Sequence, residues 1–162
     1  MTEKERQHIF GNWLEQHKAL IFKIVRAYSS STMDQDDLFQ EIIIQVWRSV
    51  PSFRQESSVT TWLYRIALNT AIKWTKREQR QAQKETLDKV QHFLHEPQPI
   101  NEQLLWLYDA IHQLDEVDRS ITLLFLDGFS YKEMAIMLGI TESNVGVKIN
   151  RIKKQLINLS KK

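Results

Sequence analysis

The sequence predicts an all-α protein, with two small helical domains joined by a flexible linker and a helix-turn-helix in the C-terminal domain. Apolar residues recur at helical spacing, and no segment alternates convincingly with period two. Only 4 Gly and 3 Pro occur among the 162 residues, which leaves little room for a loop-rich architecture. A polar stretch separates two helical groups, so we expect domains over residues 8–77 and 101–160 and a linker over 78–100.

Composition narrows the class of protein. The net charge is only +2, but no acid follows Glu142, whereas Lys and Arg recur to the C-terminus, which favours contact with phosphate. With 0 Cys, neither a disulfide framework nor a thiolate metal site is possible. No apolar signal core and no run of membrane-spanning length occurs. We therefore expect a soluble cytoplasmic protein without direct membrane insertion.

The first domain is expected to contain helices over residues 8–28, about 34–49 and about 60–79. The first is either one helix or two consecutive ones, and the "SSST" segment at 29–32 then offers helix caps. The acids of "DQDD" fall in a first helical turn, where carboxylates suit the positive end of the helix dipole. The second helix carries a clean apolar stripe at helical spacing, formed by Phe39, Ile42, Ile43, Val46, Trp47 and Val50.

Two faces of these helices have compositions that suggest binding. Opposite the apolar stripe of the second helix, one aliphatic residue lies among acids and an amide, which is typical of a protein-docking patch; the alternative is a single exposed apolar residue. On the third helix, one side combines an aromatic ring, an amide and cations, which suits single-stranded nucleic acid unless the tryptophans are simply core. The first face comprises Asp37, Gln40, Glu41, Ile44 and Arg48, and the second Trp62, Arg65, Asn69, Lys73 and Lys76.

The stretch "SYKEMAIMLGITESNVGVKINRIKKQL" predicts two short helices around a bend. Ser130 and Glu133 form a capping-box pattern, Gly139 permits the bend, and Thr141 is the expected N-cap of the second helix. A basic second helix after such a turn is the pattern of a DNA-binding helix-turn-helix, although an ordinary helical hairpin would also satisfy it. We expect Val145, Ile149 and Ile152 to face inward, and Asn144, Lys148 and Arg151 to share an outward face.

Catalytic function finds little support in the sequence. His92 and His95 lie three residues apart, but one pair without a third ligand is no metal site. There is neither a Gly-rich phosphate loop nor a nucleophile elbow. We therefore predict no enzymatic activity, no catalytic residues, no metal and no cofactor.

Two blocks of sequence resemble a known family. "DQDDLFQEIIIQVWRSVPSFRQESSVTTWLYRIALNTAIKWTKR" is similar to the second conserved region of bacterial sigma factors, most of all the extracytoplasmic function (ECF) group. Its acidic "D-L-x-Q-E" is present from Asp37 to Glu41, and its "T-W-L-Y-R-I-A-x-N" from Thr61 to Asn69. The segment from "LDEVDRSITLLFLDGFS" to the closing "R-x-K-x-x-L" resembles the fourth region. Together the blocks cover most of residues 10–159.

The resemblance implies an alternative sigma factor that joins core RNA polymerase and directs promoter-specific initiation. It implies that the docking patch binds the clamp helices of the largest polymerase subunit. The other partners it implies are the polymerase flap, promoter DNA and an anti-sigma factor. The implied minus-ten residues are Phe53, Arg54, Gln55, Glu56, Ser57, Ser58, Thr61, Trp62, Arg65, Asn69, Lys73 and Lys76. The implied minus-thirty-five residues are Glu142, Ser143, Asn144, Lys148, Asn150, Arg151 and Lys153.

This chain departs from the family at some of these positions. Gly146 stands where many relatives carry a cation, and Gln55 and Ser58 also differ from common choices. The Arg151 side chain is expected either to hydrogen-bond a guanine edge or to hold a phosphate. A stand-alone helix-turn-helix regulator is the alternative function.

Overall fold

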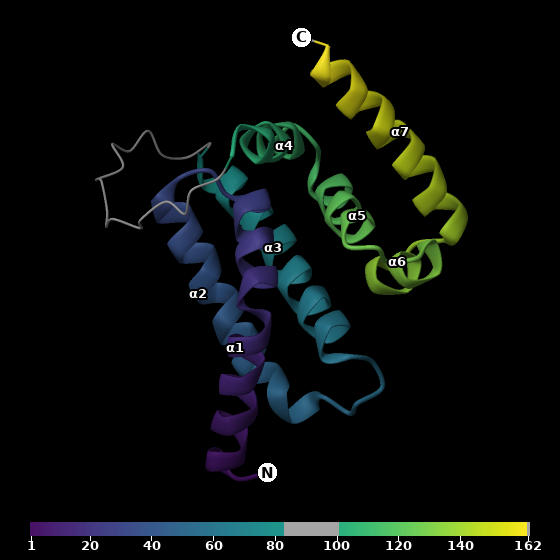
Figure 1. Ribbon diagram of the computed structural model, residues 1–162. Helices are drawn as coiled ribbons and strands as arrows, with labels where there is room; N and C mark the ends of the chain where they lie inside the picture. Colours follow the sequence, from purple (N-terminus) through teal and green to yellow (C-terminus); the bar gives the residue numbers. More distant parts are fainter. Residues whose placement is uncertain (83–100, 162) are drawn as a thin grey trace. The chain divides into compact units, whose positions relative to one another are not determined.

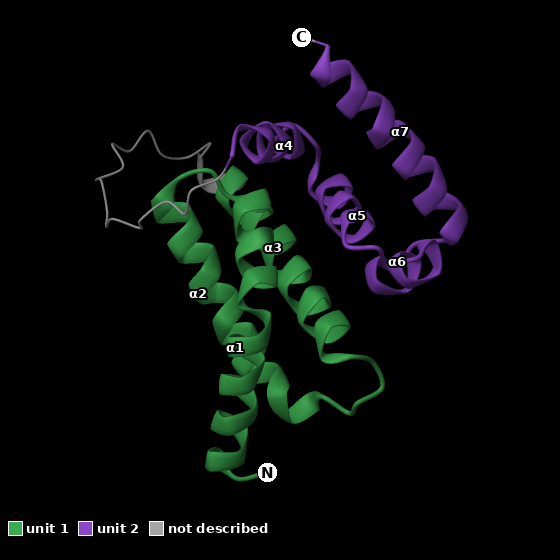
Figure 2. Ribbon diagram, in the orientation of Figure 1, with its two compact units in different colours: residues 1–96 green, residues 97–162 purple. Residues whose placement is uncertain are grey.

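The computed structural model describes residues 1–82 and 101–161, and all regular structure in these residues is helical. The chain divides into two compact units, residues 1–96 and 97–162 (Figure 2). The predicted all-α fold with two helical domains is therefore confirmed. Most of the predicted linker, including the His92 and His95 pair, lies outside the described residues.

Unit 1 is built from three long helices, each of which contacts the other two (Figure 1). The long first helix, α1, is kinked at His17, whose φ of −122° and ψ of 16° are not helical. The third helix extends past the expected end at Gln79, into the segment predicted as linker. The elements of this unit are α1 (Glu3–Tyr28), α2 (Thr32–Ser49), the short 3-10 helix η1 (Val50–Ser52) and α3 (Val59–Ala82).

The core of unit 1 follows the helical spacing of its apolar residues. The expected stripe of α2 is half right: Ile42 and Val46 are fully buried, whereas the neighbouring Phe39 and Trp47 are only half-buried. The prediction omitted Leu38, which is fully buried. Each such side chain contributes about 1.5–3 kcal/mol by leaving water. The fully buried residues of this core include Ile21, Ile24, Leu38, Ile42, Leu63, Tyr64 and Leu68.

The first turns of α1 hold the end of α2. Arg6 donates hydrogen bonds from Nη2 and Nε to the carbonyl oxygen of Trp47, at 2.9 and 3.2 Å. Its guanidinium lies 4.1 Å from the centroid of the Trp47 ring, and Phe10 packs edge-on against the same ring at 5.2 Å. The same carbonyl oxygen accepts a hydrogen bond from the Val50 backbone N–H at the C-cap, and the cation of Arg6 there complements the helix dipole. This contact fixes the helix that bears the predicted docking patch.

Over residues 101–161, unit 2 consists of four helices, and the last two form the predicted helix-turn-helix. Ser130 and Glu133 form the expected capping box, and Thr141 caps the last helix through a hydrogen bond from the Asn144 backbone N–H at 3.0 Å. Between these helices Gly139 has a φ of 70°, a left-handed conformation that costs little only for glycine. The helices are α4 (Glu102–His112), α5 (Glu116–Leu126), α6 (Tyr131–Leu138) and α7 (Glu142–Ser160).

The helix-turn-helix is held by one buried apolar face. As predicted, Val145, Ile149 and Ile152 of α7 are buried, with exposures of 4% or less. They face the helices that α7 contacts, α5 and α6, where Ile121 and Met134 are fully buried. The rest of the α7 surface is thereby left to the solvent.

Candidate functional site

The outward face of α2 presents the predicted docking patch to solvent. Asp37, Gln40 and Arg48 are exposed, Glu41 is half-buried, and Ile44 is 47% exposed. The core side of the same helix is fully buried, so the packing fixes which face is available. The structure thus places the five predicted residues on one exposed face, with an aliphatic side chain among polar ones.

This face continues into a groove between α2 and α3 of about 670 Å³. The groove brings together residues that the sequence analysis assigned to two different surfaces: Ile44 and Arg48 from the docking patch, and Asn69 and Lys73 from the nucleic-acid face. Glu41 of the docking patch also lines the groove, whereas Gln45, Ser49, Ile66, Thr70 and Arg77 were missed because they belong to neither pattern. The full lining is Glu41, Ile44, Gln45, Arg48, Ser49, Ile66, Asn69, Thr70, Lys73 and Arg77.

One ion pair crosses from α2 to α3 at this groove. Arg77 Nη2 lies 2.6 Å from Glu41 Oε1, and the two side chains are 48% and 36% exposed. Because both groups remain partly hydrated, such a pair contributes only about 0–1 kcal/mol to folding. Glu41 therefore stays available to a partner that offers a better-placed cation. Arg77 was missed because it lies 36 residues further along the chain.

Two aromatic residues assigned to the minus-ten region also anchor the fold. The half-buried Phe53 ring lies edge-on to Trp13 at 5.2 Å and tilted against Trp62 at 5.4 Å. The Trp62 indole Nε1 donates a hydrogen bond to Ser49 Oγ at 3.3 Å. This cluster fixes the start of the loop at residues 53–58 beside the groove, because Ser49 also lines the groove.

The loop itself is exposed and its conformation is defined. Gln55 has a φ of 60°, the left-handed conformation that non-glycine residues seldom adopt. Ser58 Oγ accepts a hydrogen bond from the Thr61 backbone N–H at 3.1 Å, as a helix N-cap does. Ser58 and Thr61 therefore have a structural role at the start of α3. The exposed residues of the loop are Arg54, Gln55, Glu56, Ser57 and Ser58.

The nucleic-acid face predicted on α3 is exposed along its length. Arg65, Asn69, Lys73 and Lys76 are all exposed, while Trp62, at its start, is half-buried. On the other side Leu63, Ala67 and Trp74 are buried. Asn69 and Lys73 are shared between this face and the groove. An amide and cations are thus presented together beside a hollow.

The register expected for α7 needs correction. Arg151 Nη2 lies 2.8 and 3.0 Å from the two carboxylate oxygens of Asp118 on α5, and Lys148 Nζ lies 3.8 Å from the same carboxylate. The Asp118 side chain is 5% exposed and that of Lys148 is 21% exposed. Lys148 therefore does not share an outward face with the exposed Asn144, whereas the Arg151 side chain reaches the same buried acid and stays 52% exposed, as expected. The sequence analysis did not consider Asp118.

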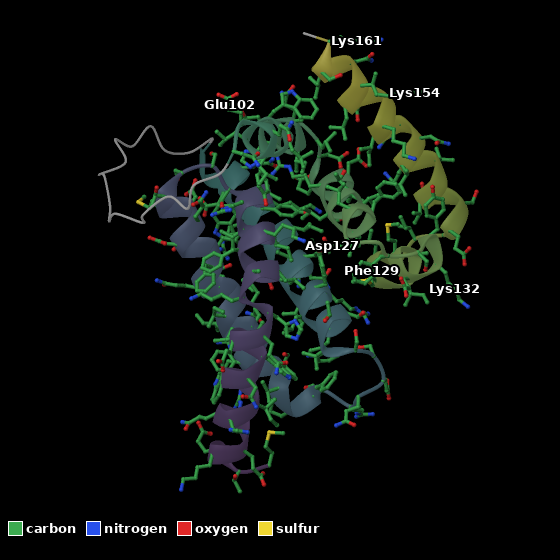
Figure 3. All side chains as sticks on the ribbon, in the orientation of Figure 1. Glu102, Asp127, Phe129, Lys132, Lys154 and Lys161 are labelled. Carbon is green, nitrogen blue, oxygen red and sulfur yellow. The ribbon has the colours of Figure 1, made fainter. Side chains whose placement is uncertain are left out.

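The exposed face of α7 is centred on other residues. Ser143 and Asn150, both predicted, are exposed, and between them Val147 is 64% exposed. Lys154 continues this face and extends from α7 (Figure 3). Val147 was missed because the sequence analysis considered only hydrogen-bonding and cationic side chains. Of the other predicted residues, Glu142 is exposed, and the Lys153 ammonium lies 4.9 Å from the centroid of the Phe125 ring.

Gly146 lies beside an aromatic ring. A Cβ at this position would stand 3.5 and 3.8 Å from two ring carbons of Tyr131, which is ordinary van der Waals contact. We therefore expect Gly146→Ala to stabilise unit 2 by about 0.5–1 kcal/mol, because alanine loses less backbone entropy in a helix interior. Hydrogen exchange of the α7 amides measures this change.

Gly139→Ala is the matched control for this prediction. The same methyl group is added, but at a φ of 70°, so we expect faster exchange in α7 instead of slower exchange. Equal effects from the two substitutions would contradict the assignment of Gly146 to a relaxed helical conformation.

Neither a metal centre nor a membrane span emerges from the described residues. Within them no group of three or more His, Asp or Glu side chains is arranged to hold a metal ion. Over residues 1–82 and 101–161, no helix is both long and apolar enough to cross a bilayer. The surfaces described above lie on two separate helical units.

Comparisons with known proteins show the family to which the chain belongs. Residues 13–81 match the family model for Sigma-70 region 2, and residues 104–156 match that for Sigma-70, region 4. The ECF RNA polymerase sigma-E factor of Haemophilus influenzae is 34% identical over 142 residues, which are 79% of this chain and 75% of that protein. The Escherichia coli strain K12 factor of the same name is 28% identical over 171 residues, 97% and 89% of the two chains.

Solved structures show the same fold. The sigma factor RpoE of Bartonella quintana, solved with the anti-sigma factor NepR, aligns with a TM-score of 0.73 at 21% identity, over 94% of this chain and 96% of that one. CnrH, solved in complex with the cytosolic domain of CnrY, aligns with a TM-score of 0.67 at 22% identity, over 96% and 89%. The chain belongs to the ECF group of RNA polymerase sigma factors. It is an alternative sigma factor, and sigma factors are transcription initiation factors, not enzymes.

Proposed function

We propose that unit 1 docks on core RNA polymerase through the outward face of α2 and receives the melted minus-ten strand beside α3. The observation that carries this proposal is the shared groove, in which Ile44 and Arg48 of the docking face line the same hollow as Asn69 and Lys73. A chain that binds both partners at adjoining surfaces holds the DNA strand next to the polymerase. The docking residues are Asp37, Gln40, Glu41, Ile44 and Arg48, and the surface they meet is the clamp helices of the largest subunit.

The hollow is suited to an unstacked base. Ile66 provides an apolar wall, Ser49 and Asn69 provide hydrogen-bonding groups, and Arg48 and Lys73 carry positive charge toward the backbone. Unstacking a base costs a few kcal/mol, which a shaped pocket can offset while choosing the base. We propose that the loop at residues 53–58 extends one side of this pocket in the complex; the Phe53–Trp62 contact and the Trp62–Ser49 hydrogen bond support this, since Ser49 lines the groove.

Unit 2 is proposed to bind the minus-thirty-five element and the polymerase flap. Its recognition helix, α7, is capped by Thr141 and presents an exposed polar face above a buried apolar one. Cations from Lys148 to Lys161 follow the last acid, Glu142, which favours the DNA backbone. We also propose an anti-sigma factor as a partner, since the similar sigma factor RpoE was solved with one.

Run-off transcription with core polymerase on a genomic fragment library tests this function and yields the promoter sequence. We expect discrete start sites that depend on this chain. Tight binding of the purified chain to duplex promoter DNA without polymerase, with no transcripts in the run-off assay, would instead indicate a stand-alone helix-turn-helix regulator.

Asn69→Ala should slow open-complex formation about two- to tenfold and change base preference at the minus-ten element. The alanine removes the amide from the hollow, and one net hydrogen bond is worth about 0.5–1.5 kcal/mol. Permanganate footprinting of the melted strand with holoenzyme measures the effect. Asn12→Ala is the matched control, because Asn12 is an exposed amide on α1 outside the groove. Identical footprints for Asn69→Ala and the wild type would place the base pocket elsewhere.

A further inference from the structure

One side chain in the first turns of the recognition helix is both apolar and well exposed. Val147 is 64% exposed, whereas Val145 and Ile149 on either side of it are buried at 0% and 3%. Its helical neighbours on the same face are Ser143, Asn150 and Lys154. Val147 is therefore not needed by the core of unit 2, and it stands at the centre of the face that α7 presents to solvent.

The surroundings of Val147 leave it free to meet a partner at close range. The preceding Gly146 carries no side chain, and Lys148, which follows, is drawn toward Asp118 at 3.8 Å. Arg151 is bound to the same carboxylate. The outward face in the N-terminal half of α7 thus presents an isopropyl group between polar side chains.

We propose that Val147 reads a thymine in the minus-thirty-five element through contact with the thymine C5-methyl group; the inference rests on the proposed function of α7. The C5-methyl group is the apolar feature that the major groove presents, and small aliphatic side chains recognise it by contact. Valine is stiff about χ1 in a helix, so its methyl groups are placed before binding and little side-chain freedom is lost. The cations further along α7 supply charge complementarity for the DNA backbone.

Deoxyuridine probes test this contact, since they remove only the methyl group. Each thymine of the minus-thirty-five element, in the promoter found by run-off transcription, is replaced singly by deoxyuridine in duplex probes for the wild-type holoenzyme. At one position we expect about three- to fivefold weaker binding, corresponding to one buried methyl group. Val147→Ala holoenzyme should bind the thymine and deoxyuridine probes at that position equally.

Ile157→Ala is the matched control, because Ile157 is an aliphatic residue of the same helix with 54% exposure, ten residues further along. We expect it to keep the full deoxyuridine effect. Wild-type binding that is insensitive to deoxyuridine at every position would overturn the inference, as would an unchanged deoxyuridine effect in Val147→Ala. If randomising the whole minus-thirty-five element leaves wild-type transcription unchanged, the proposed function of α7 itself fails.

Discussion

Glu41→Lys should weaken binding to core RNA polymerase by at least about 30-fold while the chain keeps its helical fold. Reversing a charge at the centre of a docking face places it against the group that formerly paired with it, which typically costs about 2–5 kcal/mol. The free chain loses only the partly exposed ion pair with Arg77, worth about 0–1 kcal/mol. Co-purification with core polymerase and a titration of holoenzyme assembly measure the loss, and circular dichroism checks the fold.

A charge swap separates docking from the internal ion pair. The double variant Glu41→Lys with Arg77→Glu restores an attractive pair across the groove but keeps the wrong charge on the α2 face. We expect the swap to remain defective in core binding. Full recovery in the swap would mean that Glu41 acts through Arg77 and not through the polymerase, and wild-type assembly by the single variant would remove Glu41 from the interface.

Local patterns predicted the helices well because their causes are local. The capping box at Ser130, the left-handed turn at Gly139 and the N-cap at Thr141 each depend on a few consecutive residues, and all three are present. The outward face of α2 could likewise be predicted, since apolar spacing on one side of a helix defines the other side. These features need no knowledge of what the helix packs against.

The contacts that sequence patterns missed join residues far apart in the chain. Asp118 is 33 residues from Arg151, and Glu41 is 36 from Arg77. Helical spacing placed Lys148 and Arg151 on one outward face because it carries no information about a buried acid on another helix. The groove was not predicted for the same reason: its two walls, on α2 and α3, were interpreted as separate surfaces. Exposure of Val147 followed only once the packing of α7 was known.

Arg151→Ala should destabilise unit 2 by about 1–3 kcal/mol, a structural effect that a purely DNA-facing arginine would not have. The substitution removes the closest cation from a carboxylate that is 5% exposed, and leaves it only the ammonium of Lys148 at 3.8 Å. Removing the charged partner of a buried acceptor lowers the free energy of unfolding by about this amount. Hydrogen exchange of the α5 and α7 amides measures the change in this unit separately from the rest of the chain.

A double-mutant cycle with Asp118→Ala shows whether the pair is the cause. If Arg151 stabilises unit 2 through this ion pair, the double variant should lose less free energy of unfolding than the sum of the losses in the two single variants. Lys154→Ala is the control, because Lys154 is an exposed cation on the same helix. We expect it to leave hydrogen exchange in α5 and α7 unchanged.

The same variant decides between the alternatives for Arg151 on DNA, when holoenzyme is assayed on a library randomised across the minus-thirty-five element at two salt concentrations. Because Asp118 already holds the guanidinium, we expect Arg151→Ala to weaken all promoters alike, with no base pair relaxed and no change in the salt slope. A guanine contact would instead relax one base pair at a cost of about 1–3 kcal/mol, and a phosphate contact would reduce the salt slope by about 1. Either of those results, with hydrogen exchange unchanged, would show that Arg151 leaves Asp118 when the promoter binds.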